Sequence, residues 1–284
     1  MMRFVLVVFA LGCVPEPDLV DLDGEEDVAD SSDPPIGPSG DDDDDTTTPP
    51  DETATPVDSY DGGYGVTADA FEGRDYWLYV PDSYDPAEPA PLVVGFHGAG
   101  DNGASFFAQS DANGFFSAAD DQGFLLLIAE TRSPYSDWAN WSGNPNNDFD
   151  DMEDELADLF RLIADIDVHW NVDDAGLHGF GFSNGGLFLG VAGFAAADRF
   201  ASLACLGYGW GAFYIVTPPS LVPVQVVIGS ADSFAAYADQ TAGFLASQGH
   251  DTRYEQVPGV GHSFSGLTAA VPADDLTGWM LDHQ

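Results

Sequence analysis

Gly181-Phe182-Ser183-Asn184-Gly185-Gly186 is the stretch that decides the fold of this 284-residue chain. Its Gly-x-Ser-x-Gly pattern fits a sharp turn from a strand into a helix, with the serine hydroxyl exposed at the apex. Side chains at positions 181 and 185 would collide with such a turn, so both must be glycine. The N-terminus of the helix would lie beneath Ser183 and favour negative charge developing there. We therefore predict that Ser183 is a nucleophile.

The segments around this turn alternate between short apolar runs and amphipathic stretches. Apolar runs predict buried strands at 91–96, 124–129, 175–182 and 222–228, and helices are expected around 114–121, 152–166 and 235–247. Gly176 and Gly179 weaken the strand before the turn. Strands alternating with helices predict a mostly parallel sheet with helices on both faces.

An acid and a histidine follow Ser183 on turns that could reach it. Asp232 comes after the strand at 222–228, and His262 lies in the glycine-rich turn Gly259-Val260-Gly261-His262. We predict that Asp232 accepts a hydrogen bond from His262, which acts as the base for Ser183. Two alternatives stay open for Asp232: it could cap the next helix, or Asp239 could be the acid instead. His262 could also be a structural histidine.

A second glycine-rich turn, His97-Gly98-Ala99-Gly100, directly follows the strand at 91–96. Such a turn could present the backbone N–H of Ala99 to an oxyanion, and the N–H of Asn184 would be the second donor. The simpler alternative is a tight turn without a role in catalysis.

Several motifs occur in the order of a known family: Tyr76 to Pro81, Pro91 to Gly98, a loop with two tryptophans, Gly181 to Gly186, and Gly261-His262. From about residue 64 to 262, the chain resembles the polyhydroxybutyrate depolymerase and feruloyl esterase-like group of α/β-hydrolases. The resemblance implies an α/β-hydrolase fold and cofactor-free ester hydrolysis by Ser183, Asp232 and His262. The chain departs from the family by lacking disulfides and the Val-Pro that often follows the acid.

The tentative substrate-pocket residues are His97, Trp138 and Trp141. The tryptophans belong to an aromatic loop after the strand at 124–129, and ligand sites in such folds gather at that edge of the sheet. These tryptophans could equally pack the loop onto the domain. Because the chain ends 22 residues after His262, we expect small or soluble esters: acetyl, hydroxycinnamoyl or short hydroxyalkanoate. The alternatives are a polyester depolymerase and a catalytically silent, lipid-anchored binding module.

The N-terminal part has the form of an export signal followed by a tether. Residues 1–12 hold Arg3 and an apolar run too short to span a bilayer, and Ala10-Leu11-Gly12-Cys13 resembles a bacterial lipobox. Residues 13–63 are acidic and poor in apolar side chains, which predicts a disordered tether. We expect residues 64–284 to form the catalytic domain of an exported lipoprotein, held by Cys13 at the outer membrane, in the periplasm or at the cell surface. An ordinary signal peptide would give a secreted protein instead.

Composition excludes some partners. The formal net charge is −43, with six arginines and no lysine, so nothing could neutralise the phosphates of a nucleic acid. No paired Cys/His spacing predicts a metal site. We predict that Cys205, in an apolar run, is a buried free thiol, and we expect a monomer.

Overall fold

The computed structural model describes residues 60–133, 138, 145–209 and 218–283, with the backbone alone for 145–150. The predicted signal at residues 1–12, Cys13, nearly all of the tether, and Trp141 lie outside the described residues. The first strand begins at Gly65, one residue after the predicted start of the domain.

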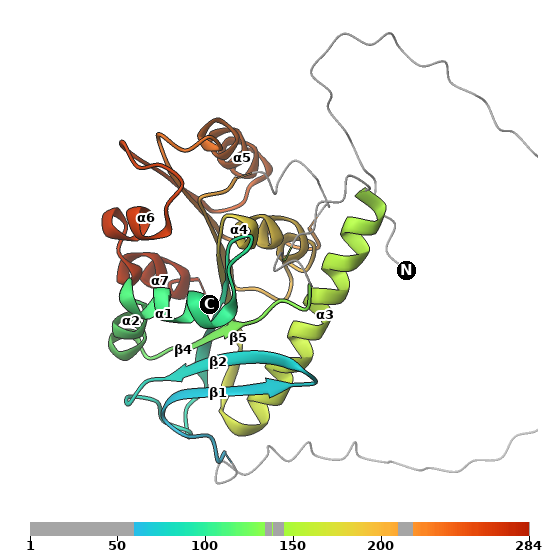
Figure 1. Ribbon diagram of the computed structural model, residues 1–284, viewed down its shortest axis with the longest axis vertical. Coiled ribbons are helices and arrows are strands. Elements are labelled where there is room, and N and C mark those ends of the chain that lie inside the picture. Colours follow the sequence, from blue (N-terminus) through green and yellow to red (C-terminus); the bar gives the residue numbers. More distant parts are fainter. Residues whose placement is uncertain (1–59, 134–137, 139–144, 210–217, 284) are drawn as a thin grey trace, which may run out of the picture. The chain divides into compact units, whose positions relative to one another are not determined.

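The centre of the domain is a single eight-stranded sheet (Figure 1). Its strands are β1 (Gly65–Phe71), β2 (Arg74–Val80), β3 (Ala90–Phe96), β4 (Leu125–Ala129), β5 (Val172–Phe182), β6 (Ser202–Leu206), β7 (Val224–Gly229) and β8 (Thr252–Val257). They are ordered β1-β2-β4-β3-β5-β6-β7-β8. The pairs β1–β2 and β2–β4 are antiparallel, and all others are parallel. The carboxyl ends of β3 to β8 therefore meet at one edge.

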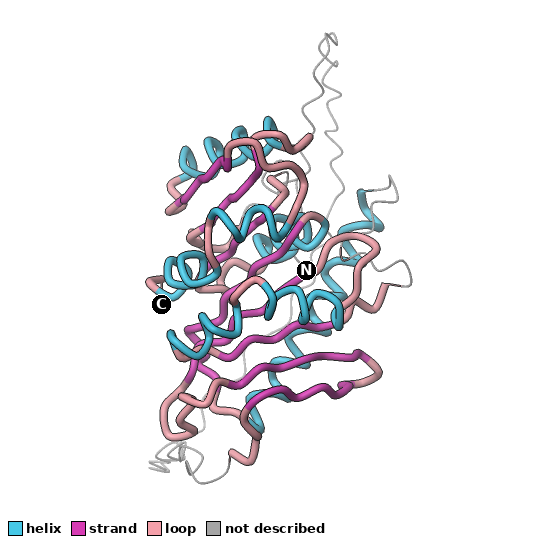
Figure 2. The backbone as a smooth tube through the Cα atoms, turned by 60° about the vertical axis from the view of Figure 1, so that its left-hand side comes forward, coloured by secondary structure: helices cyan, strands magenta, loops and turns pink. Residues whose placement is uncertain are grey.

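Helices cover both faces of the sheet (Figures 1 and 2). They are α1 (Gly103–Ala112), α2 (Phe115–Gln122), α3 (Pro145–His169), α4 (Asn184–Phe188), the π-helical η2 (Leu189–Gly193), α5 (Ala235–Gln248), α6 (Phe264–Ala270) and α7 (Ala273–Leu281). Apolar side chains of α1, α2, α6 and α7 form one core with the sheet, and those of α3, η2 and α5 form another on the opposite face. The predicted mostly parallel sheet with helices on both faces is confirmed.

Two local predictions were incomplete. The segment before β4 holds α1 as well as α2, although only a helix around 114–121 was predicted. The side chain of Asn102 starts α1 by accepting from the N–H of Ser105 at 2.9 Å. In β5, Gly179 stays paired with Val94 of β3 and Leu203 of β6. A Cβ there would lie 2.8 Å from a methyl carbon of Leu189. That glycine lets η2 pack closely on the strand.

The predicted burial of Cys205 is confirmed. Its side chain is buried in β6, and its Sγ lies 3.3 Å from the carbonyl oxygen of Gly186. Desolvation raises the pKa of the Cys205 thiol to about 12, so the thiol stays protonated and can donate to that carbonyl. Within the described ranges, no helix is long and apolar enough to cross a bilayer.

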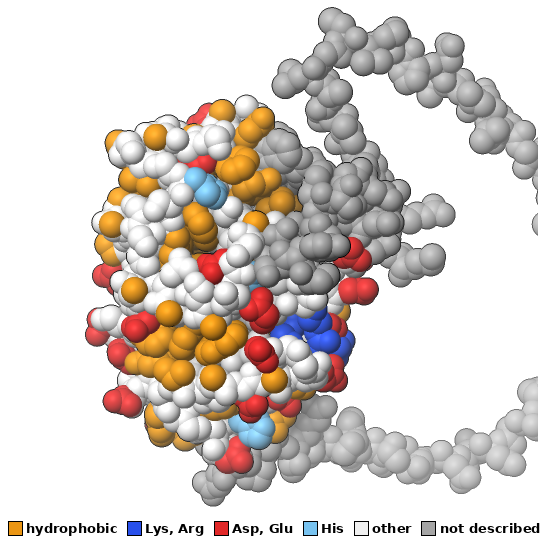
Figure 3. Space-filling view, in the orientation of Figure 1, with side chains coloured by type: hydrophobic (Ala, Val, Ile, Leu, Met, Phe, Trp, Pro, Cys, Tyr) orange, Lys and Arg blue, Asp and Glu red, His pale blue; other side chains and the backbone are white. Residues whose placement is uncertain are grey.

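Charges are unevenly distributed on the surface. On the face in Figure 3, acidic side chains are scattered, whereas the basic side chains gather in one place. Arg132 and Arg161 both pair with Asp158, at 2.8 and 2.6 Å. These arginines are therefore engaged by acidic neighbours.

A buried histidine makes the stability of the domain depend on pH. His178 in β5 is fully buried, and its Nδ1 lies 2.9 Å from Ser202 Oγ, while its Nε2 has no hydrogen-bond partner. Burial, with a smaller contribution from the charge of His283, lowers the pKa of His178 to about 4. The unfolded chain therefore binds the proton more readily between pH 6.5 and 4, and the contribution to stability present above pH 6.5 is lost as the pH falls.

We predict that this histidine contributes about 3 kcal/mol of pH-dependent stability. The free energy of unfolding of the wild type, relative to a His178→Asn variant, should fall by about that amount between pH 7 and pH 4. Urea titrations at several pH values measure the difference. A difference that stays constant over this range would contradict the prediction.

Candidate active site

Ser183 stands at the apex of the turn from β5 into α4. Its φ is +54°, which is unusual for a residue with a side chain and costs about 1–3 kcal/mol. A Cβ on Gly181 would lie 2.4 Å from the carbonyl carbon of Gly185, and one on Gly185 would lie 2.2 Å from the carbonyl oxygen of Phe96. The two glycines are thus required by close backbone packing. The strained turn presents the serine hydroxyl at the carboxyl edge of the sheet.

Asp232 and His262 meet Ser183 in one chain of hydrogen bonds. His262 Nε2 lies 2.8 Å from Ser183 Oγ, and His262 Nδ1 lies 2.7 Å from Asp232 Oδ2. The side chain of Asp232 is fully buried, whereas that of His262 is 36% exposed. A carboxylate can only accept, so Nδ1 carries the hydrogen and Nε2 is left to accept from the serine hydroxyl. This geometry can remove a proton from Ser183 as its oxygen attacks a substrate.

The loop after β7 holds the histidine turn in place. The N–H of Ala231 donates to the carbonyl of Val260 at 2.9 Å, and the N–H of Gly259 donates to Ser230 Oγ at 2.8 Å. A Cβ on Gly229 would lie 2.1 Å from the carbonyl oxygen of Val260, so only glycine permits this approach. Asp232 and His262 are therefore positioned by the same pair of loops.

The alternatives considered for the acid do not fit this arrangement. Helix α5 has Phe234 as its N-cap, and Asp232 Oδ1 accepts from the N–H of Phe234 at 2.9 Å. Asp232 thus lies before the capping position and uses its other oxygen for His262. Asp239 is exposed on α5.

Two aromatic side chains flank the imidazole of His262. The ring centroids of Phe182 and Phe234 lie 4.9 and 5.6 Å from that of His262. Both phenylalanines are half-buried. Both rings pack against the imidazole and add apolar surface next to His262.

The turn His97 to Gly100 lies against the serine, as an oxyanion-binding turn would. A Cβ added to Gly98 would be 3.5 Å from the Cβ of Ser183. Ala99 is exposed beside it, and Asn184 is the first residue of α4. N–H groups in the first turn of a helix point towards its N-terminal end, where Ser183 stands. Both predicted oxyanion donors therefore belong to segments that adjoin the serine.

The predicted pocket residues lie elsewhere than expected. His97 is fully buried, and Trp138 is 2% exposed, with its ring against Phe96 and Phe188. Neither side chain is available to line an open pocket, so the packing alternative describes Trp138.

Sequence reasoning missed Glu130 and Ser230. Glu130 Oε1 lies 3.3 Å from His97 Nε2, and Ser230 supports the histidine turn. Glu130 could have been found, because it follows β4 directly and β4 pairs with β3 in parallel. Among the described residues, no group of three or more His, Cys, Asp or Glu side chains could hold a metal ion.

Comparisons with known proteins agree with this architecture. No family model matches the chain. Feruloyl esterase C of Emericella nidulans is 27% identical over 138 residues, which are 48% of this chain and 47% of that protein. The matched stretch thus spans about half the length of the curated relative.

Among solved structures, a thermostable esterase matches with a TM-score of 0.59 at 17% identity, covering 80% of this chain and 63% of that one. The feruloyl esterase module from Clostridium thermocellum, in complex with sinapinate, matches with a TM-score of 0.57 at 15% identity, covering 78% and 91%. The chain has the α/β-hydrolase fold, and the predicted similarity to feruloyl esterases is confirmed. The similarity to polyhydroxybutyrate depolymerases stays a prediction.

Proposed function

We propose that this chain is a serine carboxylesterase that works through an acyl-enzyme intermediate. The observation that carries the proposal is the chain of hydrogen bonds from Asp232 through His262 to Ser183. Ser183 itself stands at the strained turn between strand and helix. Similarity to feruloyl esterase C supports the class of reaction.

The reaction follows from the positions of these groups. Ser183 Oγ attacks the ester carbonyl carbon while its proton passes to His262 Nε2. The carbonyl oxygen becomes an oxyanion that accepts from the N–H groups of Ala99 and Asn184. The intermediate collapses, the alcohol leaves with the proton from His262, and an acyl-serine remains. Water then gives a proton to His262 and attacks the acyl carbon. The bond from that carbon to Ser183 Oγ breaks, the acid is released, and Ser183 Oγ takes the proton back from His262. Asp232 stabilises the imidazolium in both steps.

Small or soluble esters are the proposed substrates, with hydroxycinnamoyl esters first among them. The curated relative is named a feruloyl esterase. The phenylalanine rings beside His262 offer apolar surface to an aromatic acyl group. Acetyl and short hydroxyalkanoate esters are the other candidates.

A panel of esters tests the proposal. Purified protein is assayed with methyl ferulate, p-nitrophenyl acetate, p-nitrophenyl butyrate, soluble hydroxybutyrate oligomers and solid polyhydroxybutyrate. We expect hydrolysis of soluble esters, with the highest kcat/KM for the ferulate. Clearing of solid polymer without comparable activity on soluble esters would favour the depolymerase alternative. Absence of all turnover and of labelling by a fluorophosphonate would favour the silent binding module.

We also propose that the mature protein is anchored to a membrane through lipidated Cys13. The lipobox-like Ala10-Leu11-Gly12-Cys13 and the long acidic segment after it support this localisation. In a bacterial host, Cys13→Ser should move the protein from the membrane fraction to the soluble fraction or block its maturation. Fractionation and labelling with a clickable fatty acid measure this. Unchanged membrane association without label would contradict lipidation.

A further inference from the structure

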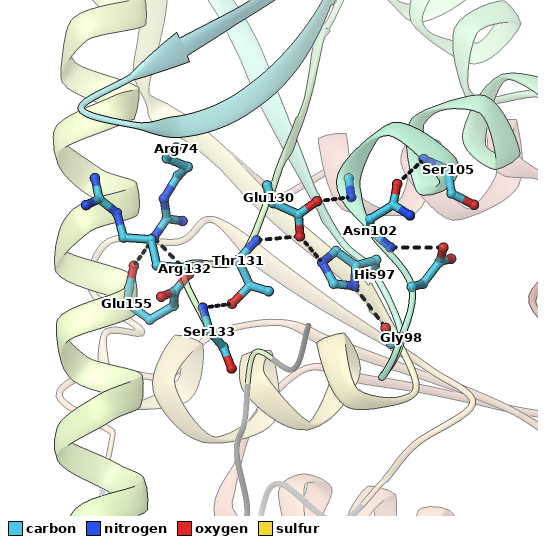
Figure 4. A network of polar contacts seen from close by, with 12 residues as sticks. Arg74, His97, Gly98, Asn102, Ser105, Glu130, Thr131, Arg132, Ser133 and Glu155 are labelled. Atoms are coloured by element: carbon cyan, nitrogen blue, oxygen red, sulfur yellow. Dashed lines mark hydrogen bonds and ion pairs between the residues drawn. The ribbon is translucent and has the colours of Figure 1, made fainter. Parts of the chain in front are cut away.

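His97 and Glu130 occupy matching positions at the carboxyl edge of the sheet. β3 and β4 are parallel neighbours with Gly95 paired to Ile128, so the residues just beyond the two strands lie side by side. Figure 4 shows the two side chains facing each other. His97 is fully buried, although it stands only two residues before the exposed Ala99.

Both ring nitrogens of His97 face oxygen atoms. Nδ1 lies 2.9 Å from the carbonyl oxygen of Gly98, and Nε2 lies 3.3 Å from Glu130 Oε1. The contact between Nε2 and Glu130 lies within ion-pair distance but does not have the alignment of a hydrogen bond. Both facing atoms are acceptors, so the two contacts are favourable together only when both ring nitrogens carry a hydrogen, as in the imidazolium. The imidazole is thereby fixed between the sheet edge and the turn.

The carbonyl of Gly98 is held from two sides. It accepts from His97 Nδ1, and it also accepts from the N–H of Asp101 at 3.2 Å. No peptide bond in the described chain is cis, so the N–H of Ala99 points opposite to this carbonyl in the same plane. Fixing the direction of the Gly98 carbonyl therefore fixes the direction of the Ala99 N–H.

Glu130 is itself fixed by backbone groups. Its Oε2 accepts from the N–H of Gly103, the first residue of α1, at 2.8 Å, and its Oε1 accepts from the N–H of Thr131 at 3.1 Å. The ring of Trp138 also packs near that of His97, with the two ring centroids 5.4 Å apart. The imidazole thus has a rigid support and little freedom to turn.

Resting on the proposed esterase function, we propose that His97, supported by Glu130, is a positioning residue for the oxyanion donor at Ala99. It does not touch the substrate. Its Nδ1–H holds the Gly98–Ala99 peptide in the plane that aims the Ala99 N–H at the position of the oxyanion. This role explains why a histidine is buried directly beneath the turn.

Two replacements of His97 separate this role from simple packing. In His97→Asn, the amide nitrogen can occupy the place of Nδ1 and still donate to the Gly98 carbonyl. In His97→Gln, the longer side chain can reach Glu130 but has no donor at the Nδ1 position. We expect kcat for a soluble ester to fall about 10- to 100-fold in the glutamine variant with KM nearly unchanged. The asparagine variant should retain clearly more activity.

An inhibitor that forms the oxyanion reports on the same donor. A trifluoromethyl ketone adds to Ser183 Oγ: the O–C bond forms, the carbonyl electron pair moves onto oxygen, and the serine proton goes to His262. The Ki for this compound should rise in His97→Gln by about the factor by which kcat/KM falls. His178→Asn, which removes another fully buried histidine from the sheet, is the matched control and should lower stability without changing kcat or Ki at pH 7.5.

The outcomes separate the two proposals. If the wild type shows no ester hydrolysis that depends on Ser183, the proposed function itself is wrong. An active, Ser183-dependent wild type whose folded His97→Gln variant keeps the same kcat and Ki would overturn the positioning role alone. Equal losses in the glutamine and asparagine variants would also overturn it, because the Gly98 contact would then not be the one that matters.

Discussion

Replacing Ser183 with alanine is expected to abolish ester hydrolysis while the domain stays folded. kcat should fall about 10⁴- to 10⁶-fold, because the acyl-enzyme cannot form without the serine oxygen. The backbone bonds of this residue do not depend on its hydroxyl: its N–H donates to the carbonyl of Leu206 and its carbonyl accepts from Leu187. Ester hydrolysis and a thermal melt, measured on the same preparation, check both parts of the expectation.

A neighbouring serine supplies the matched control. Ser233 is exposed on the loop that carries Asp232 and takes no part in the proposed chemistry. Ser233→Ala should keep near wild-type kcat and react with a fluorophosphonate, whereas Ser183→Ala should do neither. Full activity in Ser183→Ala would reject the mechanism, since no other group described here is placed to replace the missing nucleophile.

The nucleophile turn could be predicted from sequence because its constraints are local. Gly181 and Gly185 are required by backbone atoms a few residues away and by the neighbouring β3. The glycine pattern is therefore sufficient to predict the turn. Asp232 could be predicted because it follows a predicted strand, and His262 because it lies in a glycine-rich turn after the serine and the acid; the strand β8 before His262 was not predicted. The fold then determines on which side of the sheet the loops of Asp232 and His262 lie and in which direction they run.

The burial of His97 and Trp138 could not be predicted in the same way. Whether an aromatic loop lines a pocket or packs inward depends on contacts with distant segments, here Phe96 and Phe188. Sequence spacing does not reveal those contacts. Helix α1 was missed for a related reason: its start depends on the side chain of Asn102, and its apolar residues do not follow a clear amphipathic pattern.

Replacing Asp232 with asparagine is expected to have the second largest effect, because the acid controls which nitrogen of His262 carries the hydrogen. The carboxylate accepts from Nδ1–H at 2.7 Å, which leaves Nε2 unprotonated opposite Ser183 Oγ. An asparagine amide can turn its NH₂ towards Nδ1 and favour the tautomer with hydrogen on Nε2, which cannot take the serine proton.

In related triads this exchange lowers kcat about 10⁴-fold with the geometry intact, and a loss of similar size is expected for Asp232→Asn at neutral pH. The loop should survive, because the asparagine oxygen can still accept from the N–H of Phe234. Asp239→Asn is the control: this acid is exposed on α5, and its replacement should leave kcat unchanged. Both variants are measured with the same soluble ester and compared by thermal melt. If Asp239→Asn were the damaging change and Asp232→Asn the harmless one, the assignment of the acid would be wrong, and the contact between Asp232 and His262 would be structural.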